Sequence, residues 1–112
     1  MKITTEEKES YTIITIEGSL SNENLKEFEK VLDTYIAKGK HILIDFSKLT
    51  FIFSSGLSVL LSHYVASKEK DLIFVIYGMK NELIRLFEIT EISRHMPVCD
   101  SLEEALSYIN RK

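Results

Sequence analysis

Residues that interrupt or cross-link a fold are scarce in this chain, which has one proline (Pro97), one cysteine (Cys99), four glycines and no tryptophan. A lone cysteine cannot form an internal disulfide, and no second thiol is present for metal or redox chemistry. No Pro-rich or Gly-rich linker divides the sequence, so we expect a single domain over residues 1–112. The cysteine content is consistent with a reducing cytoplasm.

Long apolar runs and basic runs are also absent. No stretch approaches the roughly 18 to 20 apolar residues that span a bilayer, and residues 1–9 lack an apolar signal core. Fourteen Lys and Arg against 17 Asp and Glu give a net charge of −3. No basic cluster could follow a phosphate backbone. We therefore expect a cytoplasmic protein with neither membrane insertion nor direct binding to nucleic acid.

The sequence offers little for cofactors or metals. Neither of the glycine-rich nucleotide-binding patterns, G-x-x-x-x-G-K and G-x-G-x-x-G, occurs. His41, His63 and His95 lack ligand spacing with one another or with Cys99. We predict no cofactor and no metal site.

What the sequence does contain is alternating strand and helix patterns. The β-branched segment 11–17 predicts a strand that ends at Gly18 and pairs with residues 2–5 as an opening hairpin. Near-continuous apolar runs at 41–46 and 72–77 predict central, parallel strands covered on both faces. Apolar residues spaced by three and four predict a helix from Ser21 that stops at Gly39: Leu25, Phe28, Leu32, Tyr35 and Ile36.

The second half continues the alternation. A helix after residue 54 should bury one apolar stripe and provide a right-handed crossover between the central strands. Residues 81–88 predict a further helix, residues 95–99 an edge strand that tolerates Pro97, and a capping box of Ser101 and Glu104 begins a last helix. The stripe expected to be buried in the crossover helix consists of Leu57, Leu60, Leu61, Tyr64 and Val65.

The junction before the crossover helix is where we place the function. Ser54, Ser55 and Gly56 stand at a helix start, where backbone N–H groups are unpaired and negative charge is favoured. We interpret Ser54 as the helix N-cap. Ser55 is followed at i+3 and i+7 by Ser58 and Ser62, a narrow polar face on which a partner's backbone could approach closely.

A serine nucleophile is the enzymatic alternative for the same junction. It needs a base within hydrogen-bond reach, and His63 lies eight residues after Ser55, roughly 12 Å along a helix. His41 should lie at the opposite end of its strand, and no G-x-S-x-G elbow is present. We therefore predict a protein that is not an enzyme.

The sequence resembles the STAS domain of anti-sigma factor antagonists over residues 11–109. The likeness rests on residues 45–52 (DFSKLTFI), on 54–57 (SSGL) and on 101–106 (SLEEAL). It implies an α/β domain with a mixed four- or five-stranded sheet and about four helices. It also implies binding to an anti-sigma factor that is a serine kinase, in a partner-switching circuit where phosphorylation of Ser55 ends the binding. The predicted contact residues are Phe53, Ser54, Ser55, Gly56, Ser58 and Ser62.

One residue departs from the family motif, because Phe53 stands where an aspartate precedes the two serines. Phenylalanine supplies neither charge nor hydrogen bond, so phosphorylation of Ser55 is expected to be impaired or differently regulated. Phe53 either packs into the core beside Phe51 or stands exposed as an aromatic anchor. The alternative function is an accessory subunit or small-ligand-binding module of a transport or stress-sensing complex. The oligomeric state and the partner's identity stay open.

Overall fold

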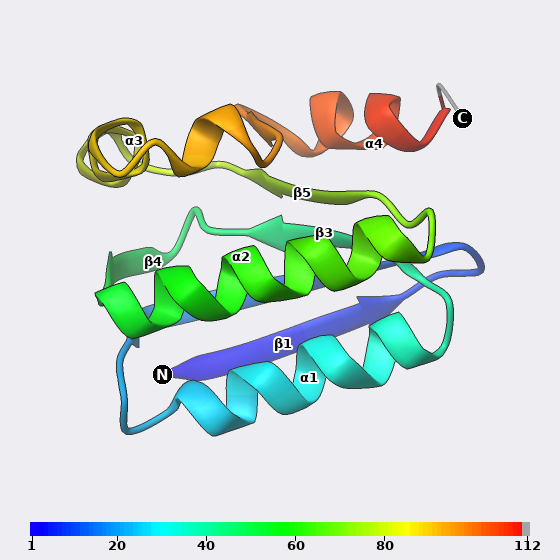
Figure 1. The fold of residues 1–112 in the computed structure, drawn as a ribbon, viewed down its shortest axis with the longest axis horizontal. Coiled ribbons are helices and arrows are strands. Elements are labelled where there is room, and N and C mark those ends of the chain that lie inside the picture. The colour runs from blue at the N-terminus through cyan, green and yellow to red at the C-terminus, as the bar shows by residue number, and fades with distance from the viewer. Residues whose placement is uncertain (111–112) are drawn as a thin grey trace.

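The computed structural model describes residues 1–110, so residues 111–112 of the predicted domain lie outside the described residues. Strands and helices alternate along most of the chain (Figure 1). In chain order they are β1 (Lys2–Glu7), β2 (Tyr11–Leu20), α1 (Leu25–Ala37), β3 (His41–Asp45), β4 (Leu49–Ile52), α2 (Ser54–Glu69), β5 (Phe74–Tyr77), α3 (Asn81–Ile89), the 3₁₀ turn η1 (Ile92–Arg94), β6 (Val98–Cys99) and α4 (Leu102–Asn110).

The strands form one mixed sheet in the order β1-β2-β3-β5-β6. The hairpin pair β1 and β2 is antiparallel, whereas β2, β3, β5 and β6 are successively parallel. This confirms the opening hairpin, the central parallel strands and the edge strand after residue 95. Pro97 is tolerated because it takes part in the pairing through its carbonyl, which accepts a hydrogen bond from the amide of Ile76.

The sheet has six strands, one more than the upper limit expected from the sequence. The additional strand is β4, for which the sequence predicts no strand, and it pairs in parallel with the last residues of β2. It forms because β2 does not stop at Gly18: that glycine has φ +97, the register shifts there, and the strand continues to Leu20. The extra strand sets the position from which α2 begins.

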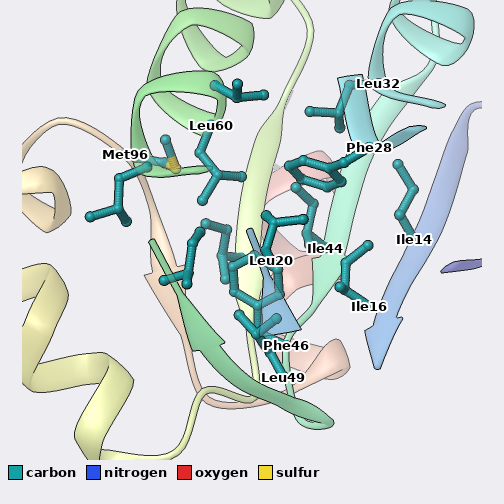
Figure 2. Packing of buried hydrophobic residues seen from close by; sticks show 14 of the residues in the cluster. Ile14, Ile16, Leu20, Phe28, Leu32, Ile44, Phe46, Leu49, Leu60 and Met96 are labelled. Carbon is teal, nitrogen blue, oxygen red and sulfur yellow. The ribbon is translucent and has the colours of Figure 1, made fainter. Parts of the chain in front are cut away.

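Alternation along the strands divides the buried side chains between two faces of the sheet. Ile42 and Ile44 belong to the larger core cluster with residues of α1 and α2, whereas Leu43 belongs to a smaller cluster with Ala105 of α4. Figure 2 shows the larger cluster packing between strands and helices. It contains, among others, Ile14, Ile16, Leu20, Phe28, Leu32, Phe46, Leu49, Leu60 and Met96.

Helices α1 and α2 run side by side (Figure 1), and each contacts the other. The sequence prediction for α2 is wrong in part: Leu57 and Leu60 are buried, but Leu61 and Tyr64 are only half-buried and Val65 is exposed. The reason is that α2 also packs sideways against α1, which buries His63 and Val59 instead. The uncovered residues line a surface groove of about 500 Å³ together with Lys68, Glu69 and His95.

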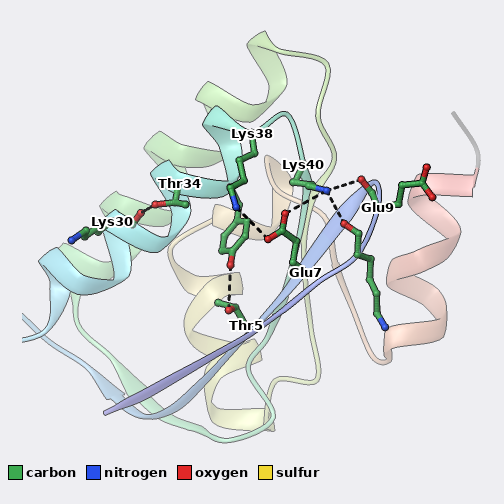
Figure 3. Close-up of polar contacts among 9 residues, drawn as sticks. Thr5, Glu7, Glu9, Lys30, Thr34, Lys38 and Lys40 are labelled. Atoms are coloured by element: carbon green, nitrogen blue, oxygen red, sulfur yellow. Dashed lines mark hydrogen bonds and ion pairs between the residues drawn. The ribbon is translucent and has the colours of Figure 1, made fainter.

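Polar contacts fasten the opening hairpin to the end of α1 (Figure 3). The ammonium of Lys38 lies 3.2 Å from a carboxylate oxygen of Glu7, and this contact lowers the pKa of the Glu7 carboxyl. Lys40 donates to the carbonyls of Lys8 and Glu9 at 2.7 Å each. These contacts hold the hairpin end of the sheet, leaving the opposite end, where β2 and β4 finish, for the serine junction.

Candidate functional site

The junction between β4 and α2 is held by main-chain hydrogen bonds. The N–H of Phe53 donates to the carbonyl of Leu20 at the end of β2, at 3.1 Å. The carbonyl of Phe53 then accepts from the N–H groups of Gly56 at 2.9 Å and Leu57 at 3.2 Å. The first turn of α2 is therefore tied to the sheet through residue 53.

The prediction that Ser54 is the helix N-cap is wrong, because the N-cap is Phe53. Its backbone is extended, with φ −84 and ψ 164, and its carbonyl takes the first helical bonds, whereas Ser54 is already helical. Phenylalanine has no side-chain acceptor, so the N-cap makes no side-chain hydrogen bond, and no acidic residue occupies the first turn. The helix start thus lacks its usual side-chain compensation for unpaired N–H groups.

Gly56 faces inward at this junction. A Cβ at this position would lie 2.8 Å from Cγ1 of Ile52 and 3.3 Å from Cδ2 of Leu20. Only glycine lets α2 approach β4 and β2 this closely. Gly56 is buried, so its role in the predicted contact surface is to seat the two serines before it.

Ser55 is partly exposed and its hydroxyl has one side-chain partner. Oγ of Ser55 donates to Oδ1 of Asn22, at 2.5 Å, from the loop between β2 and α1. The loop is braced by Asn24, whose side chain accepts from the N–H of Ser21 and donates to the carbonyl of Ser19, both at 2.9 Å. Sequence reasoning missed Asn22 because it lies 33 residues from Ser55. The pairing of β2 with β4, which brings the two loops together, was also not anticipated.

Phe53 stands on the surface, which decides between the two alternatives left open by the sequence. Its side chain is 49% exposed and that of Phe51 is 48% exposed. The two rings pack edge to face, with centroids 4.9 Å apart and planes at 85°. They share one side of the extended segment, as expected, but neither enters the core. They form an exposed aromatic pair next to the serines.

The serine face of α2 is open to solvent over two turns. Ser54, Ser58 and Ser62 are exposed and Ser55 is partly exposed. The hydroxyl of Ser62 donates to the carbonyl of Val59 at 3.0 Å. All four side chains on this face are short. Together with Phe53, these residues form the candidate contact surface, which extends from the N-cap of α2 to Ser62.

Two of the histidines, His63 and His41, make contacts with groups other than Ser55. His63 is buried, with Nε2 at 2.8 Å from Oδ1 of Asp33 and Nδ1 at 2.7 Å from the carbonyl of Val59. Nδ1 of His41 accepts from the N–H of Ile73 at 2.9 Å. The hydroxyl of Ser55 bonds instead to an amide, which cannot act as a base at neutral pH. A serine hydrolase site is not assembled by these contacts.

The structure also bears on metal binding, membrane insertion and cysteine reactivity. In residues 1–110 no three His, Cys, Asp or Glu side chains gather closely enough to hold a metal ion. Within the same part of the chain, no helix has both the length and the apolar character needed to cross a bilayer. Burial raises the pKa of the Cys99 thiol, so this cysteine is a poor nucleophile.

The hairpin entry, the mixed sheet and the helix that starts at the serine junction together define an α/β fold. The profile of the STAS domain family matches residues 2–105, and the chain belongs to this family.

Known relatives agree with this assignment. The anti-sigma-B factor antagonist of Listeria monocytogenes is 28% identical over 81 residues, which cover 71% of each chain. The crystal structure of an anti-sigma factor antagonist from Mycobacterium paratuberculosis superposes with a TM-score of 0.88 at 18% identity, covering 97% of this chain and 93% of that one. The fold also occurs in a sulfate transporter family protein from Wolinella succinogenes, with a TM-score of 0.74, 18% identity and coverage of 86% and 81%.

Proposed function

We propose that this protein is an anti-sigma factor antagonist: it binds an anti-sigma factor that is also a serine kinase, and phosphorylation of Ser55 ends the binding. Membership of the STAS family and the Listeria relative support the class of partner. The observation that carries the proposal is the site itself, a partly exposed serine hydroxyl at a helix start, beside an exposed aromatic pair and an exposed face of short serine side chains. The protein acts by binding and not by catalysis.

The exposed Phe53 ring and the small side chains of Ser54, Ser58 and Ser62 suit a protein partner. Aromatic residues, including Phe, are enriched at protein interfaces, and buried aromatic anchors are frequent hot spots of binding energy. Small serines on the adjoining helix face allow the partner's backbone to come close. The centre of the unphosphorylated surface carries no charged side chain, so no ion has to be desolvated on docking.

Phosphorylation changes this balance. The kinase transfers the γ-phosphoryl group of ATP to Oγ of Ser55: the new O–P bond forms, the bond to the β-phosphate oxygen breaks, ADP leaves, and the hydroxyl proton is released. The product carries about −1.5 to −2 charges at pH 7. The start of α2 accommodates this charge in the free protein, because unpaired N–H groups and the helix dipole favour an anion there. A tight interface would have to desolvate it, at a cost of several kcal/mol.

Position 53 carries no acidic side chain, and in this proposal its absence slows the phosphorylation of Ser55. The first turn of α2 has no acidic residue, and the Phe53 ring packs on Phe51. No carboxylate from that position meets the kinase, so we expect slow phosphorylation of Ser55 and a long-lived binding form.

The experiment is a pull-down followed by a kinase assay. Immobilised protein is expected to recover an ATP-binding anti-sigma factor from extract of the source bacterium. Incubation with that partner and ATP should give slow phosphate incorporation at Ser55 by mass spectrometry. The incorporation should be lost in Ser55→Ala and retained in Ser10→Ala, a matched control at an exposed serine outside the contact surface. Recovery of the kinase without any phosphate on Ser55 would refute the proposal that phosphorylation of Ser55 ends the binding. Rapid stoichiometric phosphorylation would contradict the impairment.

The second candidate function is an accessory subunit of a transport complex. The likeness to the sulfate transporter family protein concerns the fold, and it is this observation that keeps the alternative open. The same pull-down separates the two functions, because recovery of transporter subunits in place of a kinase would support the alternative.

A further inference from the structure

The contact between Asn22 and Ser55 joins two loops that the fold brings to one end of the sheet. Asn22 is exposed and follows β2, whereas Ser55 lies in the first turn of α2. The Ser55 hydroxyl donates to Oδ1 of Asn22. The two bonds made by Asn24 fix the loop, so the amide of residue 22 is held next to the hydroxyl by a braced backbone.

The amide of Asn22 can also donate hydrogen bonds, and the contact with the free Ser55 hydroxyl does not use this ability. Its Nδ2 carries two N–H donors, and among residues 1–110 it donates to no partner. A hydroxyl can donate a hydrogen bond, but a phosphate monoester dianion can only accept. An amide serves both, because half a turn about its terminal C–C bond exchanges the carbonyl oxygen for the N–H group.

We propose that the side-chain amide of Asn22 forms a hydrogen bond with residue 55 both before and after phosphorylation, and that the direction of this bond reverses. With the free serine its carbonyl accepts the hydroxyl proton, and with phosphoserine the rotated amide donates an N–H to the phosphate. This inference rests on the proposed phosphorylation of Ser55 and names the residue that stabilises its product. The first-turn N–H groups of α2 and the Asn22 amide then hold the phosphate from two elements, without an acidic or basic side chain.

Substitutions at position 22 separate this role from a merely structural one. Aspartate accepts from the hydroxyl as asparagine does, but it can only repel a phosphate. Alanine does neither. The effect of Asn22→Asp should therefore depend on the state of Ser55: nearly neutral with serine and unfavourable with phosphoserine. Glu23→Gln, at the neighbouring exposed position, is the matched control for a change of charge in the same loop.

The test installs phosphoserine at position 55 by genetic code expansion, so no kinase is needed. The pKa of the phosphate is measured by ³¹P NMR in the parent protein and in the Asn22→Ala and Asn22→Asp variants, together with the melting temperature of each protein in both states. Donation by the amide favours the dianion, so the phosphate pKa should be lowest in the parent, higher in the alanine variant and highest in the aspartate variant. Phosphorylation should lower the melting temperature most in Asn22→Asp, and Glu23→Gln should leave the phosphate pKa near that of the parent.

Equal phosphate pKa values in the parent and in Asn22→Ala would overturn the proposal. A second readout needs no substitution at position 22: the side-chain ¹⁵N–¹H signals of Asn22 should move when Ser55 is replaced by phosphoserine, and unchanged signals would also overturn it. These outcomes are independent of the partner. A failure of the kinase assay would refute the proposed function, whereas a failure here would leave phosphorylation intact and remove only the role of Asn22.

Discussion

Replacing Phe53 by aspartate and by alanine gives the sharpest test of how the serine junction is built. Phe53 has the extended backbone of an N-cap, but its side chain cannot accept a hydrogen bond. Aspartate at this position should accept from the unpaired N–H groups of the first turn. Alanine removes the same ring without adding an acceptor, so it is the matched reference.

The expected difference follows from three terms. Both substitutions lose the edge-to-face contact with Phe51, about 0.5 to 1.5 kcal/mol, together with similar apolar area, so this cost cancels. Aspartate gains a capping hydrogen bond of about 1 kcal/mol and a dipole interaction of about 0.3 to 1 kcal/mol. Phe53→Asp should therefore be more stable than Phe53→Ala by about 1 to 2 kcal/mol, and close to the parent protein.

Urea unfolding followed by far-UV circular dichroism measures the three free energies of unfolding. Phe53→Asn separates the terms, because it caps without charge and should fall between alanine and aspartate. If the aspartate variant is no more stable than the alanine variant, residue 53 is not the N-cap and the geometry of the junction is wrong.

The same pair of variants tests the proposed function. We expect Phe53→Asp to be phosphorylated on Ser55 faster than the parent, and Phe53→Ala to show no such gain. Equal rates in parent and aspartate variant would argue that an acid at this position is irrelevant to the kinase. Stability and phosphorylation are read out separately, so one result can stand without the other.

Three further experiments test the surrounding structure. Gly56→Ala adds helix propensity of about 1 kcal/mol but overlaps Ile52, a strain of about 1 to 3 kcal/mol, so thermal unfolding should show a net loss, and a gain would contradict the close approach. A double-mutant cycle of His63→Ala and Asp33→Ala should give a coupling below about 1 kcal/mol, because the Asp33 side chain is 70% exposed; a larger value would mean that the pair is shielded from water. Burial raises the pKa of Tyr77 to about 12. Because the fold disfavours its phenolate, stability should be complete below about pH 10 and fall as pH rises towards 12; Tyr77→Phe should remove that part of the decline, and identical curves would refute the shift.

Much of the architecture could be predicted because each element carries its own periodic pattern. The apolar runs at β3 and β5 predicted buried parallel strands, and the spacing of Phe28, Leu32 and Ile36 predicted the buried face of α1. The Ser101 cap of α4 is likewise local: its hydroxyl accepts from the N–H of Glu104 at 3.2 Å. Such signals depend on neighbours within a few residues, which a sequence displays directly.

The details of the junction escaped prediction because they depend on tertiary contacts. Serine is a preferred N-cap residue, but the bond from the N–H of Phe53 to Leu20 keeps residue 53 extended and moves the helix start back by one residue. The exposure of Val65 depends on how α2 leans on α1. The partner of Ser55 lies in a loop 33 residues earlier, and only the pairing of β4 with β2 brings it there.

In the proposed switch, the residues that provide binding affinity differ from the residue that is phosphorylated, although both lie at the same junction. The exposed rings of Phe51 and Phe53 provide apolar area that does not change when Ser55 is modified. Ser55 lies two residues further on and contributes a charge only after phosphorylation. The main-chain bond of Phe53 to Leu20, and those of Gly56 and Leu57 to Phe53, hold the first turn of α2 beside the rings, so a partner that covers the rings also covers the serine. Truncating an aromatic ring should therefore weaken binding in both states, whereas Ser55→Ala should preserve binding and abolish only its reversal.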